Sequence, residues 1–139
     1  MKLKQNKSGF TLLEIIIVII IVGVLASLAL PRFFATVEFS KSTEALNSMS
    51  TLRGSMERCY MASAGTYVGC TITSLDVADP GTSPGARFTY SATDQTATSY
   101  SLVATRNTVD GGTSGDLIRV VQTSTGVTRS GTGAFVGIK

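Results

Sequence analysis

The hydrophobic residues are concentrated near the beginning of the chain. Residues 10–30 form a run of 21 residues in which Glu14 is the only ionisable side chain. A helix rises about 1.5 Å per residue, so a helix of this length measures roughly 31 Å and matches the hydrocarbon core of a bilayer. Polar and basic residues precede it, among them Lys2, Lys4 and Lys7. Because basic residues stay on the cytoplasmic side, the pattern predicts one membrane crossing with the amino terminus inside and the residues after Pro31 outside.

Two simpler interpretations of residues 10–30 are a cleaved secretory signal and a plain membrane anchor. Ser27-Leu28-Ala29 supplies the small-x-small pattern of a signal-peptidase site. Two features count against a secretory signal. The apolar region of such a signal has roughly 7 to 15 residues, and an acidic side chain such as Glu14 inside an apolar segment costs free energy unless it is paired.

After Pro31 the apolar positions mostly recur at intervals of three or four, which predicts an amphipathic helix over residues 31–64. Pro31 lacks an N–H group, so we expect one long helix with a kink or a loosened turn at this position. Gly65 follows Ala64 and can adopt the left-handed conformation that ends a helix. The expected apolar positions of this half are Phe34, Val37, Leu46, Met49, Leu52, Met56 and Tyr60.

Residues 65–139 are rich in Thr, Ser and Gly, and short segments alternate between apolar and polar side chains. Such alternation predicts three or four short antiparallel strands within residues 86–139, after a connecting loop over residues 65–85. Ser124-Thr125-Gly126 resembles a hairpin turn. A sheet this small cannot cover both of its faces, so one face should pack on the carboxyl half of the helix in an α+β fold. The alternating positions are Phe88 and Tyr90, Tyr100, Leu102 and Ala104, Ile118 and Val120, and a last strand near residues 127–129.

The composition argues against common classes of enzyme. The chain has 139 residues, of which 43% are hydrophobic and 15% charged, and its mean hydropathy is +0.28. Histidine is absent, which excludes Ser-His-Asp and Cys-His catalytic arrangements and every histidine metal site. Two cysteines alone cannot form a tetrahedral zinc site. We therefore predict a protein that is not an enzyme and has no cofactor.

The formal net charge of +3 comes from the residues before the apolar run. Lys2, Lys4 and Lys7 are three of the twelve basic residues, and the other nine match the nine acidic residues in number. A basic surface for nucleic acid is therefore only weakly supported, because aspartates offset the arginines of the sheet region. These arginines are Arg87, Arg106, Arg119 and Arg129, and the aspartates are Asp76, Asp79, Asp94, Asp110 and Asp116.

Two pairs of side chains are candidates for a cross-link and for a metal site. Cys59 and Cys70 face an oxidising compartment on the predicted topology, so we expect a disulfide, with two buried free thiols as the alternative. Asp110 and Asp116 flank a glycine-rich stretch that is a weak candidate for a calcium loop. The further acids of a calcium-specific pattern are missing, and a plain turn between strands explains the stretch more simply.

The segment Lys7-Ser8-Gly9-Phe10-Thr11-Leu12-Leu13-Glu14 resembles the class III signal of type IV prepilins and type II secretion pseudopilins. The resemblance implies a pilin-like fold, in which a long amino-terminal helical spine packs on the small sheet. It implies that prepilin peptidase removes residues 1–9 by cutting after Gly9 and methylates the amino group of Phe10. Gly23 and Pro31 bracket a stretch similar to the part of the family's membrane segment, residues 10–30 here, that can lose helicity in filaments.

Glu14 has a particular role in this resemblance. Its expected partner is the amino group of Phe10, on its own helix or on the next subunit, and the simpler alternative is a carboxylate that reaches the lipid headgroups. Pairing inside a water-poor bundle would favour one axial stagger between neighbouring helices, because an unpaired buried charge costs several kcal/mol. We therefore expect Glu14 to control assembly.

The resemblance implies a structural subunit, a major-type pilin that forms a homopolymer, with adhesion, twitching motility or DNA uptake among the roles of such fibres. The alternative is a major pseudopilin of type II secretion. The implied partners are prepilin peptidase, an assembly ATPase and a platform protein. The implied location is the inner membrane for the precursor, followed by a surface pilus or, for the alternative, a periplasmic pseudopilus.

Overall fold

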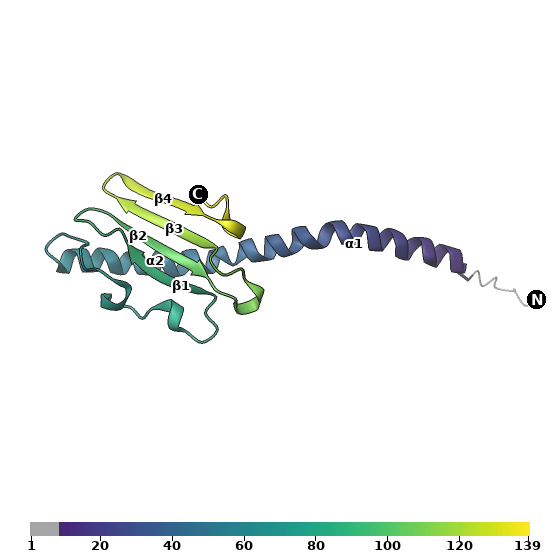
Figure 1. Ribbon diagram of the computed structural model, residues 1–139, viewed down its shortest axis with the longest axis horizontal. Coiled ribbons are helices and arrows are strands. Elements are labelled where there is room, and N and C mark those ends of the chain that lie inside the picture. Colours follow the sequence, from purple (N-terminus) through teal and green to yellow (C-terminus); the bar gives the residue numbers. More distant parts are fainter. Residues whose placement is uncertain (1–8) are drawn as a thin grey trace, which may run out of the picture. The chain divides into compact units, whose positions relative to one another are not determined.

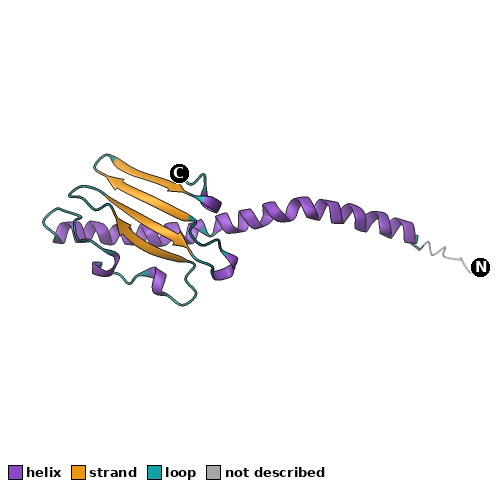
Figure 2. Cartoon of the chain, in the orientation of Figure 1, coloured by secondary structure: helices purple, strands orange, loops and turns teal. Residues whose placement is uncertain are grey.

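The computed structural model describes residues 9–139, so Lys2, Lys4, Lys7 and the rest of the expected leader before Gly9 lie outside the described residues. The chain divides into two compact units, one ending at Thr36 and the other formed by Val37–Lys139. The predicted α+β class is confirmed: helix precedes an antiparallel sheet, and the sheet lies in the second unit (Figure 2).

The predicted long helix is confirmed over Leu12–Ala62, and one irregular residue divides it into two parts. Helix α1 (Leu12–Ser40) continues through Pro31, and helix α2 (Ser42–Ala62) begins after a single intervening residue, Lys41. Lys41 keeps helical dihedral angles, with φ −65° and ψ −19°, and its N–H donates to the carbonyl of Glu38 at 3.1 Å. The sequence analysis expected a loosened turn at Pro31 and did not anticipate the interruption at Lys41.

The end of α2 lies within two residues of the predicted position. Ala64 and Gly65 have positive φ angles of 56° and 80°, and the N–H of Gly65 donates back to the carbonyl of Tyr60 at 3.0 Å. A residue in the left-handed conformation at the end of a helix allows backbone N–H groups to donate hydrogen bonds to carbonyl groups of the last turn, which otherwise have no partner within the helix. The glycine signal therefore identified the helix terminus correctly.

The sheet has four antiparallel strands in the order β1-β2-β3-β4 (Figure 1). The strands are β1 (Phe88–Thr93), β2 (Tyr100–Arg106), β3 (Leu117–Thr123) and β4 (Gly126–Gly131). Thr123 pairs with Gly126, so Ser124 and Thr125 form the predicted hairpin turn. The alternation of apolar and polar residues located β1, β2 and β3. The predicted hairpin turn located β4, whose residues are exposed except for Gly131.

The core lies between α2 and one face of the sheet. Ala45, Met49, Leu52 and Met56 supply the helix side of this core. Phe34 and Val37, at the amino-terminal end of the apolar stripe, lie outside this core and are 64% and 39% exposed. The sheet residues that complete the core are Phe88, Tyr100, Leu102, Ala104, Ile118 and Val120, and Phe135 and Ile138 join from the carboxyl terminus.

Arg106, at the end of β2, is buried and so cannot contribute to a basic surface of the sheet region. Its Nε donates to Glu38 Oε1 at 2.6 Å, and its Nη1 donates to the carbonyls of Arg87 and Asn107 at 3.1 and 2.9 Å. These bonds, led by the one from Arg106, lower the pKa of Glu38. A buried guanidinium is tolerated because a carboxylate and backbone carbonyls satisfy it.

Gly112→Ala should destabilise the second unit by about 1–3 kcal/mol through overpacking. A Cβ at Gly112 would lie 2.2 Å from Cζ of Arg106 and 2.4 Å from the carbonyl oxygen of Asn107. The matched control is Gly54→Ala inside α2, where the nearest atom is 3.6 Å away and the change should stabilise by up to about 1 kcal/mol. Thermal unfolding of the full chain in detergent measures both, and equal effects of the two variants would contradict this packing account.

Candidate processing and assembly site

The first turn of α1 is closed by a reciprocal pair of hydrogen bonds between Thr11 and Glu14. The N–H and hydroxyl of Thr11 donate to Oε2 of Glu14 at 2.8 and 2.9 Å, and the N–H of Glu14 donates to Oγ1 of Thr11 at 3.2 Å. This is a capping box, which satisfies backbone donors that have no partner inside the helix. The Thr-x-x-Glu spacing is a readable signal for it, and the sequence analysis missed it.

Gly9 and Phe10 precede the helix and are exposed. Phe10 is 85% exposed, and a Cβ built on Gly9 would have no atom within 4 Å. Nothing in the described chain therefore requires a glycine at position 9, so a requirement for glycine would come from another molecule that approaches the backbone closely.

The apolar part of α1 has no cover in the described chain. No residue of α1 is buried, and the large apolar side chains from Leu12 to Leu30 are at least 39% exposed. The helical stretch Leu12–Ala62 is long and apolar enough to cross a membrane by length and composition. Its exposure distinguishes it from the core helix of a water-soluble protein, which is mostly buried.

Gly23 and Pro31 both lie within α1. No atom of the described chain packs on the Cα of Gly23. A Cβ at Gly23 would meet no atom within 4 Å. Pro31 has no N–H to donate to the turn before it, and the Ser27 hydroxyl in that turn donates to the carbonyl of Val24 at 2.7 Å. Both residues weaken the helix, and a side chain at position 23 would meet nothing in the described chain.

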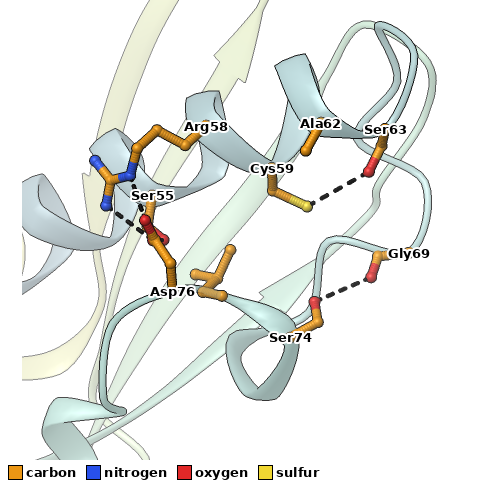
Figure 3. A pocket seen from close by; sticks show the side chains of 9 residues that line it. Ser55, Arg58, Cys59, Ala62, Ser63, Gly69, Ser74 and Asp76 are labelled. Atoms are coloured by element: carbon orange, nitrogen blue, oxygen red, sulfur yellow. Dashed lines mark hydrogen bonds and ion pairs between the residues drawn. The ribbon is translucent and has the colours of Figure 1, made fainter.

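The predicted disulfide between Cys59 and Cys70 is confirmed, with Cα atoms 6.0 Å apart. It joins the last turns of α2 to the following loop, beside a surface pocket of about 410 Å³ (Figure 3).

In that pocket Arg58 and Ser55 both donate to Asp76, and chiefly the bond from Arg58 lowers the pKa of Asp76 to about 2. The two charged side chains of the pocket, Arg58 and Asp76, therefore form an ion pair with each other.

Replacing Cys59 and Cys70 together by serine should lower the free energy of unfolding by about 3 kcal/mol, because the bridge closes a loop of 11 residues in the unfolded chain. Thermal unfolding of the oxidised and reduced full chain in detergent provides the same comparison without mutation. An unchanged melting temperature in both experiments would show that the bridge contributes nothing.

Asp110 and Asp116 accept hydrogen bonds from different parts of the chain. Asp110 accepts from Nε of Arg87 at 2.6 Å, whereas Oδ2 of Asp116 accepts from the N–H of Ala134 at 3.0 Å. Gly133 packs directly on the Asp116 carboxylate. Within residues 9–139, no group of three or more His, Cys, Asp or Glu side chains is placed to hold a metal ion.

Comparison with known protein families identifies a motif near the amino terminus of the chain. Residues 4–30 match the prokaryotic N-terminal methylation motif. This match contains Gly9, Phe10, Glu14 and Gly23, which the sequence analysis had singled out.

Curated relatives match over a limited stretch. The chain is 43% identical over 58 residues to fimbrial protein EcpC of Eikenella corrodens and 37% identical over 54 residues to type II secretion system core protein G of Aeromonas hydrophila. It is 30% identical over 59 residues to type IV major fimbrial protein FimA of Dichelobacter nodosus. These alignments cover 39–42% of this chain and 38% of each relative.

Proposed function

We propose that this chain, a relative of type IV fimbrial proteins and type II secretion core proteins that carries their N-terminal methylation motif, is the major structural subunit of a type IV pilus. One observation carries the proposal. The helical part of the motif, residues 12–30, is apolar on all sides except at Glu14 and has no buried residue, whereas Val37–Lys139 has its own core. A helix of this kind needs lipid or other apolar helices around it.

Cleavage after Gly9 is the first step of the proposal. It would remove the residues that contain Lys2, Lys4 and Lys7, retain the apolar helix on the mature protein and expose the amino group of Phe10, which the peptidase would methylate. The exposed position of Gly9 and Phe10 ahead of α1 supports access by such an enzyme. The mature subunit would start with Phe10 and have equal numbers of acidic and basic side chains.

The two carboxylate oxygens of Glu14 would then have different roles. Oε2 accepts both hydrogen bonds from Thr11, while Oε1 accepts none in the described chain. Oε1 can therefore receive the positively charged amino group of Phe10 from a neighbouring subunit. Between apolar helices this pairing would be strong, and loss of either partner would cost several kcal/mol.

Assembly would transfer residues 10–30 from lipid to a bundle of identical helices. Large apolar residues favour the bilayer by about 0.3–0.6 kcal/mol each, so release of this helix into water is prohibitive. A bundle of sibling helices covers the same apolar surface again. We therefore expect an inner-membrane precursor with its amino terminus in the cytoplasm, a homopolymeric filament outside, and an assembly ATPase and platform protein that move the subunit. Gly23 and Pro31 would allow residues 23–31 to loosen during this packing.

The second candidate function is a major pseudopilin in a periplasmic pseudopilus of type II secretion. Similarity to type II secretion system core protein G of Aeromonas hydrophila favours it. Deletion of the gene separates the candidates: loss of protein secretion with no change in surface fibres supports the pseudopilin, and loss of surface fibres supports the pilin.

Mass spectrometry of the protein from membranes tests the processing step. The expected mature chain begins at Phe10, lacks nine residues and carries one added methyl group on its amino terminus. A chain that begins near Leu30 would instead identify residues 10–30 as a cleaved secretory signal and refute the proposal.

A further inference from the structure

The carboxyl half of α2 and two turns of the sheet border a surface cavity of about 290 Å³. The order β1-β2-β3-β4 places the turn between β1 and β2 at the same end of the sheet as the turn between β3 and β4 (Figure 1). We call this cavity the tyrosine pocket. Its volume suits a small ligand or one long side chain. Its lining includes Glu57 and Tyr60 of α2, Tyr67 of the following loop, Gln122 of β3, and Thr98 and Ser124 of the two turns.

Two tyrosine rings form the apolar part of the tyrosine pocket. The ring centroids of Tyr60 and Tyr67 are 4.6 Å apart, and the Tyr67 centroid is also 4.6 Å from that of the buried Tyr100. Tyr67 lies in the loop that the Cys59–Cys70 bridge closes, so the bridge keeps this ring beside α2. The faces of aromatic rings are electrostatically negative and attract cations.

Glu57 supplies a negative charge to the same pocket. The Tyr67 hydroxyl donates to its two carboxylate oxygens at 2.9 and 2.8 Å. Burial and the nearby Glu57 carboxylate raise the pKa of Tyr67, so the phenol keeps its proton at neutral pH. A hydroxyl has a single proton to donate, and each oxygen of Glu57 therefore retains the capacity to accept from another donor.

The charge of Glu57 has no cationic partner within residues 9–139. Glu57 takes part in none of the ion pairs of these residues, and no basic side chain among them lines the tyrosine pocket. Arg53 lies one turn earlier on α2, but its Nη2 donates to Oε1 of Gln122 at 3.1 Å. Every other acid of Val37–Lys139 has a basic or a backbone partner. Those in ion pairs are Glu38, Glu44, Asp76, Asp94 and Asp110, and those that accept from backbone N–H groups are Asp79 and Asp116.

We infer that the tyrosine pocket binds an alkylammonium group, such as the end of a lysine side chain or of a free amine. The ammonium group would donate to Glu57 and lie against the ring of Tyr60, and its alkyl chain would cover apolar ring surface. A neutral sugar also suits a pocket with aromatic rings and hydroxyl groups, but it would leave the charge of Glu57 uncompensated. The inference goes beyond the proposed function, because the pocket lies within Val37–Lys139 and is present in a single subunit.

Titration of the full chain in detergent with n-butylammonium chloride tests the site. The chain has four tyrosines and no tryptophan, so NMR of protein labelled on its tyrosine rings can follow each ring. The signals of Tyr60 and Tyr67 should shift until they saturate, with a Kd in the millimolar range that suits so small a ligand. The signal of Tyr90, which lies outside the tyrosine pocket, should not shift. The neutral analogue n-butanol should bind about tenfold more weakly or not at all.

Substitutions separate the contributions of charge and ring. Glu57→Gln keeps an oxygen that can accept from Tyr67 but removes the charge, so it should weaken butylammonium binding by about tenfold or more. Glu44→Gln makes the same change on the same helix outside the tyrosine pocket, and it should leave binding unchanged. Tyr60→Leu should weaken binding by about twofold to fivefold through loss of the ring face. An intact Cys59–Cys70 bridge and an unchanged Tyr90 signal show that each variant is folded.

Cadaverine and Nα-acetyl-lysine methylamide present the same group from a free amine and from a polypeptide, and the tighter binder identifies the source. Equal binding of n-butanol and butylammonium would overturn the inference, as would unchanged binding to Glu57→Gln protein or tighter binding of a neutral methyl glucoside. Absence of filaments would overturn the proposed function and leave this titration unaffected, so the two failures are distinguishable.

Discussion

Replacing Glu14 with alanine should leave the protein inserted in the membrane and cleaved after Gly9, yet reduce filaments by roughly a hundredfold. Without the carboxylate, the amino group of a neighbouring Phe10 would be buried between apolar helices with no partner, at a cost of several kcal/mol. Membrane fractionation measures insertion, and electron microscopy of sheared material measures assembly.

Two further variants separate the charge of Glu14 from its role in the capping box. Glu14→Gln keeps an oxygen that can accept from Thr11 but removes the charge, and it should fail to assemble like Glu14→Ala. Thr11→Ala removes the hydroxyl from the capping box, weakens the first turn by about 0.5–2 kcal/mol and keeps the charge, so it should assemble. If Glu14→Gln assembles and Thr11→Ala does not, the capping box explains the role of Glu14 and pairing with Phe10 is wrong.

Replacing Gly9 with leucine should block processing almost completely. No atom of the described chain lies within 4 Å of the added Cβ, so the fold should tolerate the change. The side chain would instead keep the cleaving enzyme from the extended backbone. Mass spectrometry should find a precursor nine residues longer than the mature chain, without the added methyl group, and microscopy should find no filaments.

Gly23→Ala is the control for Gly9→Leu, because a Cβ there also meets no atom within 4 Å. It should be cleaved and methylated normally. Normal processing of Gly9→Leu would show that cleavage does not depend on the residue at position 9, and it would remove the main support for the proposed cleavage position.

Local patterns in the sequence were sufficient for most of the fold. Strands β1 to β3 were predictable because apolar and polar residues alternate in them, and β4 because the hairpin turn at Ser124 and Thr125 precedes it. The end of α2 was predictable because Gly65 supplies a left-handed residue at low cost. The disulfide was predictable from the number of cysteines and the expected compartment.

The features that the sequence analysis missed mostly depend on partners far along the chain. The burial of Arg106 could not be predicted from its sequence neighbours, because its ion-pair partner Glu38 lies 68 residues away. Helical periodicity likewise does not show how far the sheet covers the helix, and it therefore does not show that the covered part begins after Val37. The capping box formed by Thr11 and Glu14 is an exception, because its Thr-x-x-Glu spacing can be recognised in the sequence.

Electron microscopy of sheared surface material, with mass spectrometry of the purified fibres, tests the central claim most directly. The account predicts fibres built from this chain, with every subunit beginning at a methylated Phe10, and no such fibres after deletion of the gene. Surface fibres that lack this chain, or a chain found only in membranes as a single subunit, would contradict it.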